Sequence, residues 1–203
     1  MVRVKICGIT SLDDALQSVQ AGADALGFVF HEKSPRYLST ERAESIISEL
    51  PPFVQVVGLF VNADAGFINN TADRCRLDLV QLHGDEPPDY CELIRRRIIK
   101  AFRVRDISSL IPVKDYHVAG VLLDAYSPHV FGGTGLSFNW EYAHTVADCR
   151  PIILAGGLTP GNVREAVERV NPYAVDVSSG VEESPGRKDQ EKVREFIKKA
   201  KGV

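Results

Sequence analysis

The 203-residue sequence has no excess of positive charge and no long hydrophobic run. Its 24 Lys and Arg residues are outnumbered by 27 Asp and Glu residues, so the formal net charge is −3 at pH 7. Such a chain lacks the strong positive field that attracts nucleic acid or an anionic membrane. No apolar run approaches the roughly 18 residues of a membrane span, and the short apolar N-terminus is typical of a first strand and not of a signal peptide. We therefore expect a soluble, cytoplasmic protein that binds neither nucleic acid nor membrane.

The cysteines lack the spacing of a disulfide scaffold or a structural zinc site. No two of them form a C-x-x-C pair, and none has a histidine at metal-ligand spacing. The histidines show no paired ligand spacing either. The sequence therefore predicts reduced thiols and no bound metal. The four cysteines are Cys7, Cys75, Cys91 and Cys149.

Short apolar runs alternate with longer segments whose apolar residues recur at helical spacing. This alternation is typical of a parallel sheet covered by helices. One helical stripe runs from Leu12 to Val19, and Gly22 follows where a helix usually ends. Similar stripes lie in residues 43–50, 163–170 and 193–200. The eight apolar runs are Val2–Cys7, Ala23–Phe30, Val54–Val61, Leu77–Leu82, Ile98–Phe102, Val118–Asp124, Pro151–Ala155 and Tyr173–Val177.

The number of runs and the chain length together favour one compact α/β domain over residues 1–203. Eight strand–helix units leave about 25 residues per unit, close to the lower limit of roughly 200 residues for a closed (β/α)8 TIM barrel. An open doubly wound sheet is the alternative. Its usual G-x-G-x-x-G motif is missing after the first run, where Cys7-Gly8-Ile9-Thr10 stands instead.

Glycine-rich turns follow the seventh and eighth runs, at the end of the barrel where active sites lie. Such turns offer backbone N–H groups and hydroxyls to a phosphate, although glycines also serve simply to permit tight turns. Thr159-Pro160, after the first of these turns, is typical of a helix N-cap and first helical position. The candidate phosphate ligands are Gly156, Gly157, Ser178, Ser179 and Gly180, with Gly133 and Gly135 of a third turn closing over the same ligand.

Cys7 and Asp124 end two apolar runs and are the candidates for proton transfer. A thiol at the mouth of a strand can act as a base when nearby positive groups favour its ionised form, although a lone cysteine is more often a small buried hydrophobe. Burial of a carboxyl group favours the protonated form that a general acid requires, unless the group only accepts hydrogen bonds from the next loop. Asp176, near the end of the eighth run, is a weaker candidate that can instead brace its neighbours.

Three further polar residues lie after the second run or at the end of the fourth. Arg36 follows Ser34-Pro35, where the fixed proline turn can aim a guanidinium at a substrate carboxylate, while an ordinary surface arginine is the alternative. His83 can act as a base or satisfy loop carbonyls, so we assign it no catalytic role. We expect Gln81 and His83 to line the substrate site, either touching the substrate or bracing the site.

Seven short segments, spread from the first predicted strand to the last, carry a family resemblance. They are Lys5-Ile6-Cys7-Gly8-Ile9-Thr10, Gly27-Phe28-Val29-Phe30 with Ser34-Pro35-Arg36-Tyr37, Gly58-Leu59-Phe60-Val61-Asn62, Val80-Gln81-Leu82-His83-Gly84, Gly132-Gly133-Thr134-Gly135, Leu154-Ala155-Gly156-Gly157-Leu158 and Asp176-Val177-Ser178-Ser179-Gly180-Val181-Glu182. One such segment is weak, but seven in order at barrel spacing are specific. Together they resemble the phosphoribosylanthranilate isomerases of tryptophan biosynthesis.

The resemblance implies a (β/α)8 barrel that needs no cofactor. The family's reaction is an Amadori rearrangement, in which the aminoaldose N-(5-phosphoribosyl)anthranilate becomes the corresponding 1-deoxyribulose phosphate, an aminoketose. Carried over residue by residue, the resemblance implies Cys7 as general base, Asp124 as general acid and Arg36 as the contact to the anthranilate carboxylate. The two glycine-rich turns are then the phosphate site. The expected partner is a small phosphorylated substrate, and the sequence leaves monomer and homodimer open.

Other functions compete with this interpretation. The sister isomerase of histidine biosynthesis resembles a version with aspartate in place of Cys7, and it acts on a larger, bisphosphorylated substrate. A sugar-phosphate epimerase needs metal-binding histidines and an aldolase needs a Schiff-base lysine at a strand end, and neither is evident. A phosphate-binding module without chemistry is the non-enzymatic alternative, against which the presence of both Cys7 and Asp124 argues. One departure from the family pattern is Asn139, where the family usually has aspartate, and asparagine can still cap a helix there.

Overall fold

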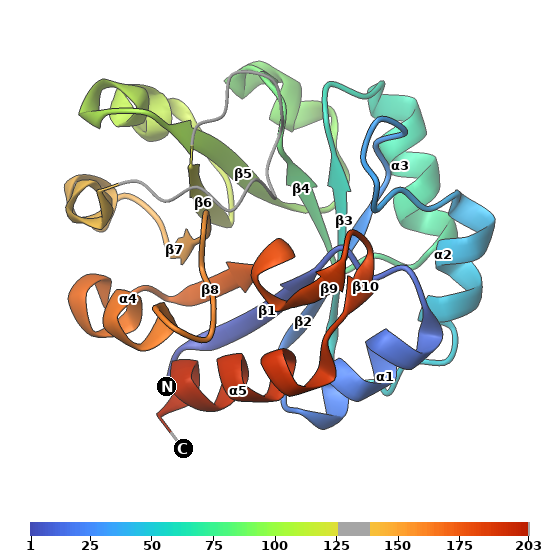
Figure 1. Cartoon of the computed structure of the whole chain (residues 1–203). Coiled ribbons are helices and arrows are strands. Elements are labelled where there is room, and N and C mark those ends of the chain that lie inside the picture. Colours follow the sequence, from blue (N-terminus) through green and yellow to red (C-terminus); the bar gives the residue numbers. More distant parts are fainter. Residues whose placement is uncertain (126–138, 203) are drawn as a thin grey trace.

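A closed barrel of eight parallel strands forms the centre of the computed structural model, which describes residues 1–125 and 139–202 (Figure 1). The strands follow one another around the barrel in chain order, and the last closes the ring by pairing with the first. The predicted (β/α)8 barrel is confirmed, and the open doubly wound sheet is wrong. The barrel strands are β1 (Arg3–Cys7), β2 (Ala25–Val29), β3 (Gln55–Phe60), β4 (Leu79–Leu82), β5 (Arg97–Val104), β6 (Gly120–Ala125), β7 (Ile152–Leu154) and β8 (Ala174–Val177).

Successive residues of each strand point alternately towards the helices and into the barrel. On β6, Val121 and Leu123 pack in the layer between strands and helices, whereas Leu122 packs in a smaller cluster inside the barrel. Because side chains alternate, Asp124 also faces the interior. Both faces of the strands are buried. This explains why the sequence shows them as continuous apolar runs and not as alternating apolar and polar residues.

α-Helices cover the barrel where the sequence predicts apolar stripes. The four stripes lie in α1, α2, α4 and α5, and each helix buries residues of its stripe. Ser11 caps α1 by accepting the N–H of Asp14, and Gly22 follows that helix with φ +100°, a conformation that favours glycine. The helices are α1 (Leu12–Gln20), α2 (Thr40–Ile47), α3 (Ala65–Arg74), α4 (Val163–Val170) and α5 (Gln190–Lys201).

Three connections contain 3-10 helices where eight regular strand–helix units predicted α-helices: η1 (Pro88–Leu93), η2 (Ile107–Asp115) and η3 (Trp140–Val146). Proline explains part of this difference, because Pro112 lies inside η2 and cannot donate an N–H to an α-helical ladder. Asn139 caps η3 by accepting the N–H of Glu141 at 3.1 Å, so its predicted capping role is confirmed.

The helix after β7 begins at Val163 and not at Pro160, where the sequence places its first turn. The carbonyl of Thr159 accepts the N–H groups of both Asn162 and Val163, and the side chain of Asn162 accepts the Thr159 N–H at 2.8 Å. These bonds close a separate turn before the helix. The predicted helix start is therefore wrong.

A small antiparallel hairpin follows β8, and the sequence analysis did not predict it. It consists of β9 (Glu182–Ser184) and β10 (Arg187–Lys188), is preceded by η4 (Ser179–Val181), and turns at Gly186 with φ +83°. The Lys188 side chain donates a hydrogen bond to the carbonyl of Cys7 at 2.6 Å. The hairpin is thus tied to the end of the first strand.

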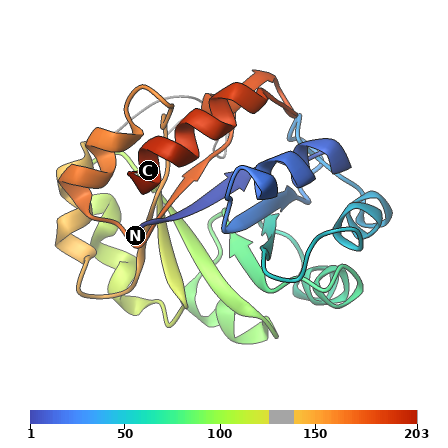
Figure 2. The same ribbon diagram turned by 90° about the horizontal axis from the view of Figure 1, so that it is seen from below.

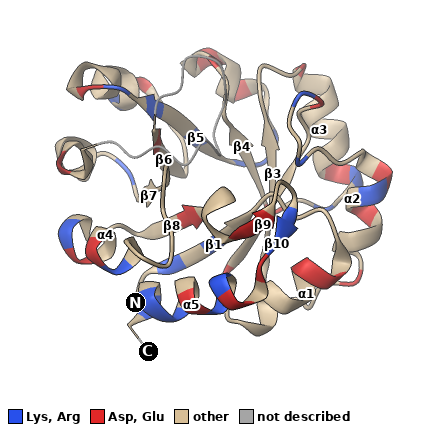
Figure 3. Cartoon of the chain, in the orientation of Figure 1, with Lys and Arg blue, Asp and Glu red and all other residues tan. Residues whose placement is uncertain are grey.

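The two ends of the described chain lie close together beneath the barrel (Figure 2). Asp24 joins them, because its carboxylate pairs with both Arg3 and Lys201. Figure 3 shows acidic and basic residues interspersed along α4 and α5, in keeping with the small net charge. Within residues 1–125 and 139–202, no helix is long and apolar enough to cross a membrane.

Candidate active site

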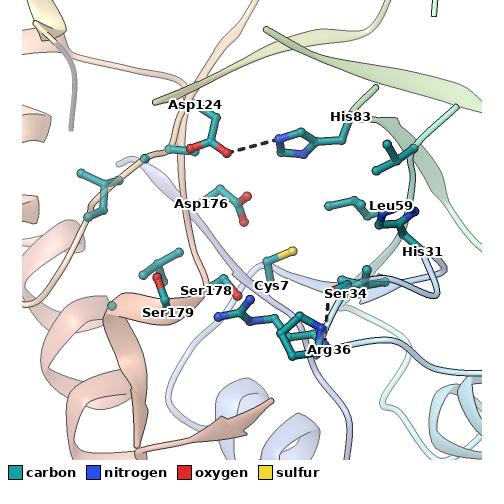
Figure 4. Close-up of a pocket in the computed structure, with 18 of the residues that line it drawn as sticks. Cys7, His31, Ser34, Arg36, Leu59, His83, Asp124, Asp176, Ser178 and Ser179 are labelled. Carbon is teal, nitrogen blue, oxygen red and sulfur yellow. Dashed lines mark hydrogen bonds and ion pairs between the residues drawn. The ribbon is translucent and has the colours of Figure 1, made fainter. Parts of the chain in front are cut away.

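A cavity of about 520 Å³ opens at the C-terminal ends of the barrel strands. Figure 4 shows the labelled side chains of this cavity pointing towards a common space. Gln81 lies below the cavity floor and is fully buried, while Gly133 and Gly135 fall outside the described residues. The predicted site residues that line the cavity are Cys7, Arg36, His83, Asp124, Gly156, Gly157, Asp176, Ser178, Ser179 and Gly180.

Strand alternation explains why these polar side chains meet. On β1, Val4 and Ile6 pack outwards under the helices, so Lys5 and Cys7 face the interior. The same alternation on β8 turns Asp176 inwards, as it turns Asp124 inwards on β6. Positions that the sequence shows as the polar ends of apolar runs are therefore neighbours in space.

The thiol of Cys7 is buried, with 5% of the residue exposed. Burial raises the pKa of Cys7 above its ordinary value, and the positive charges of Lys5 and Lys188 act in the opposite direction. Gly27 on β2 makes room for this thiol, because a Cβ at Gly27 would lie 2.7 Å from the Cys7 Sγ. Any larger residue at Gly27 would displace Cys7.

A chain of hydrogen bonds runs beneath the cavity from β8 to β6. Lys5 Nζ donates to Asp176 Oδ1 at 3.0 Å and to Gln81 Oε1 at 2.8 Å. Gln81 Nε2 lies 2.8 Å from His83 Nδ1, and His83 Nε2 lies 3.2 Å from Asp124 Oδ2. All five side chains are buried. This chain connects Lys5, the neighbour of Cys7 within the barrel, to Asp124.

The two predicted phosphate turns touch each other. A Cβ at Gly180 would lie 1.9 Å from the carbonyl oxygen of Leu158, so only glycine lets these two backbones approach so closely. Ser179 and Gly180 begin the helical turn η4, and the first N–H groups of such a turn have no partner within it. The hydroxyl of Ser178 is buried and has no hydrogen-bond partner among the described residues. Together these groups offer donors to an anion.

Arg36 lies at the opposite side of the cavity from Asp124 in Figure 4, and it is held by a buried partner. Its Nε and Nη2 atoms donate to the two carboxylate oxygens of Glu182 at 2.9 and 2.7 Å. Burial alone would raise the pKa of Glu182, but the bonds from Arg36 and the charge of Lys188 bring it below the ordinary value. The prediction of a guanidinium in the site agrees with this placement. The ion pair between Arg36 and Glu182 was not predicted from the sequence.

Lys5, Glu182 and Lys188 bond residues that line the cavity, and none of them was predicted from the sequence. Lys188 is 3% exposed and bonds Glu182 Oε1 at 2.7 Å as well as the Cys7 carbonyl. The signal for Lys5 was available, because a lysine within an apolar strand, two residues before Cys7, must share its face of the sheet. Glu182 and Lys188 lie on the hairpin that sequence patterns missed.

Metal binding finds no support in the part of the chain that the structure describes. No group of three His, Cys, Asp or Glu side chains there is arranged to hold a metal ion. The four cysteines are free thiols, three of them buried.

Comparisons with known proteins place this geometry in a family. Residues 4–199 match the model of the N-(5′-phosphoribosyl)anthranilate (PRA) isomerases. A protein of Geobacter sulfurreducens named N-(5′-phosphoribosyl)anthranilate isomerase is 68% identical over 202 residues, which cover the full length of both chains. The crystal structure of phosphoribosyl anthranilate isomerase from Thermotoga maritima has 48% identity and a TM-score of 0.95, again over the whole of both chains.

A second solved isomerase structure of that name contains reduced 1-(o-carboxyphenylamino)-1-deoxyribulose 5-phosphate. It shares 48% identity with this chain over the whole of both chains, with a TM-score of 0.91. The match therefore extends through every strand of the barrel. This chain belongs to the N-(5′-phosphoribosyl)anthranilate isomerase family.

Proposed function

We propose that this chain converts N-(5′-phosphoribosyl)anthranilate into 1-(2-carboxyphenylamino)-1-deoxyribulose 5-phosphate by general acid–base catalysis. The observation that carries the proposal is the meeting of Cys7 and Asp124 in one cavity that is also lined by the predicted phosphate turns and a guanidinium. The product analogue in the related solved structure supports this choice of substrate.

The reaction begins at the furanose ring. Asp124 donates a proton to the ring oxygen, the bond between that oxygen and C1′ breaks, and the nitrogen lone pair forms an iminium. The thiolate of Cys7 then removes the proton from C2′, and the electrons of that C–H bond form the enolamine. Tautomerisation to the ketone adds a proton to C1′ and removes one from the C2′ hydroxyl. No electron acceptor is needed, because the oxidation at C2′ is balanced by the reduction at C1′.

The two ends of the substrate fit the two remaining parts of the cavity. The phosphate is held by the turns at Gly156-Gly157 and Ser178-Ser179-Gly180 through backbone N–H groups and the unpartnered Ser178 hydroxyl. The anthranilate carboxylate takes the Arg36 donors that Glu182 leaves free. Anchoring both ends holds the sugar carbons between Cys7 and Asp124, which lowers the entropic part of the barrier.

We also infer the cellular compartment and the kind of ligand of this enzyme. Free thiols fit a reducing cytoplasm, and the ligand is a small phosphorylated molecule. The chain acts as a monomer or a homodimer, and light scattering across a concentration series distinguishes the two. One domain over residues 1–203 stays a prediction, which limited proteolysis tests.

The test is the decay of anthranilate-type fluorescence when the purified protein meets freshly generated phosphoribosylanthranilate, without added metal or nucleotide. Decay above the spontaneous hydrolysis rate, with the aminoketose as product, supports the proposal. Binding without turnover would favour the phosphate-binding module instead. Comparable turnover of the bisphosphorylated histidine-pathway intermediate would favour the sister isomerase.

A further inference from the structure

We propose that Gln81 and Lys5 are positioning residues that hold His83 in its Nε2–H form, so that the proton of Asp124 faces the substrate. The inference rests on the proposed function for the role of Asp124, but it concerns the hydrogen-bond chain beneath the cavity. Lys5 and Gln81 act through His83 and are not themselves placed against the substrate.

The orientation of the Gln81 amide follows from its first neighbour. An ammonium group has donors and no acceptor, so the atom of Gln81 that lies 2.8 Å from Lys5 Nζ must be the carbonyl oxygen. Asp176 Oδ1, 3.0 Å from the same nitrogen, fixes the ammonium in place. The NH₂ of Gln81 is therefore turned towards His83.

The orientation of Gln81 in turn determines the state of His83. Because the amide nitrogen can only donate, His83 Nδ1 must accept and carries no proton. An imidazolium would place its Nδ1–H against the amide N–H, so the imidazole is neutral and its proton is on Nε2. His83 then donates to Asp124 Oδ2 at 3.2 Å.

This donation constrains the proton of Asp124. Its Oδ2 atom accepts from His83, and its Oδ1 atom accepts the N–H of Ala125 at 2.8 Å. A proton on Asp124 must therefore be bound at a carboxyl lone pair that neither donor occupies. Asp124 lines the cavity, so those lone pairs are the ones open to a substrate oxygen. After transfer, the same two donors stabilise the carboxylate that remains.

Burial makes the arrangement rigid. Gln81 is fully buried, and Lys5 and His83 are each 4% exposed. Two buried donors that face each other cost free energy. The Gln81 amide and the His83 ring therefore cannot flip without placing a donor opposite a donor. Stability alone does not require such a chain, because well-packed apolar side chains are often as stabilising as buried ionic ones.

The decisive variant is Gln81→Glu, which keeps the shape of the side chain and replaces the amide donor by an acceptor. His83 must then carry a proton on Nδ1, and the proton of Asp124 is held between Asp124 and His83 Nε2. We expect ¹⁵N NMR of the imidazole to show a bare Nδ1 in the wild type and a protonated Nδ1 in the variant. We expect kcat to fall by about 10² or more, the scale of a lost acid, while KM changes little.

A matched background separates the change of tautomer from the added negative charge. In His83→Asn the imidazole is absent. Adding Gln81→Glu to this variant should therefore lower kcat much less than Gln81→Glu lowers it in the wild type. An Nδ1 that is protonated in the wild type, or bare in Gln81→Glu, would overturn the inference. So would an undiminished kcat, or an equal loss in both backgrounds. The NMR result does not depend on turnover, so an inactive wild type would overturn the proposed function alone.

Discussion

The barrel has a cavity at each end, and the two have nearly the same volume, about 520 Å³ at the C-terminal ends of the strands and about 510 Å³ at the N-terminal ends. The C-terminal cavity contains a thiol, carboxyl groups, an imidazole and a guanidinium. The N-terminal cavity has an apolar floor that includes Val57, Leu79, Ile99 and Ile153. Charged side chains also line it, but none of its described lining residues carries a thiol or an imidazole. Volume therefore does not distinguish the candidate active site from the N-terminal cavity. The chemistry of the lining does.

The difference arises along single strands. On β4, the inward positions are Leu79, Gln81 and then His83 just past the strand end, so one strand passes from apolar to polar between the two cavities. β6 makes the same change from Leu122 to Asp124. On β4 and β6 the lower inward positions therefore provide packing, and the upper ones are free to carry chemistry.

The largest effect is expected from removing either proton-transfer group of the C-terminal cavity. Cys7→Ala and Asp124→Asn should each lower kcat by at least about 10², because each removes a general base or acid. Circular dichroism should show an intact fold in both. Near-normal turnover of either folded variant would remove that residue from the mechanism and weaken the contrast between the two ends.

Arg36→Ala should mainly raise KM, by roughly 10- to 100-fold, the scale of a lost hydrogen bond between charged groups. Glu182→Gln should raise KM in the same direction but less, because Arg36 stays and only its ionic partner is weakened. Steady-state kinetics of both variants measures this split. An unchanged KM in Arg36→Ala would argue against contact with the substrate carboxylate.

The pH dependence should reveal Cys7. Because burial raises the pKa of this thiol, the thiolate is a minor form at neutral pH. In Asp124→Asn, where the general acid no longer titrates, the remaining kcat/KM should therefore increase by up to about tenfold per pH unit towards alkaline pH. A flat Asp124→Asn profile between pH 6 and about 9 would contradict Cys7 as the base.

The smallest effect on activity is expected at the opposite end. Ile153→Ala removes a buried side chain from the inner cluster and should lower the free energy of unfolding by about 2–4 kcal/mol. Urea unfolding measures this loss, and kcat at a temperature where the variant is folded should be unchanged. A large loss of kcat would mean that the two ends are coupled and not independent.

The sequence was sufficient for the barrel and for most of the cavity lining, for a physical reason. Strands buried on both faces show as apolar runs, and parallel strands bring the residues at their ends to one edge, so Cys7 and Asp124 could be placed without coordinates. Local turns were harder. Before α4, the Thr159 N–H donates to the side-chain oxygen of Asn162, a bond that no propensity indicates.

Partnerships across the chain were beyond the sequence. The pair Arg36–Glu182 joins residues 146 apart, and the Glu182 hairpin is too short for a periodic pattern to reveal it. The chain of bonds from Lys5 to Asp124 depends on which side chains face each other inside the barrel. Lys5 is the one member of this chain that was not predicted from the sequence, although strand alternation places it on the same face as Cys7.

The hairpin of β9 and β10 also has a consequence for biosynthesis. Lys188 bonds the carbonyl of Cys7, a residue 181 positions earlier, and Glu182 on the same hairpin holds Arg36. A ribosome synthesises β1 before this hairpin. A nascent chain that lacks the hairpin has the thiol but neither of these supports. The order of synthesis therefore delays completion of the site until the hairpin has emerged.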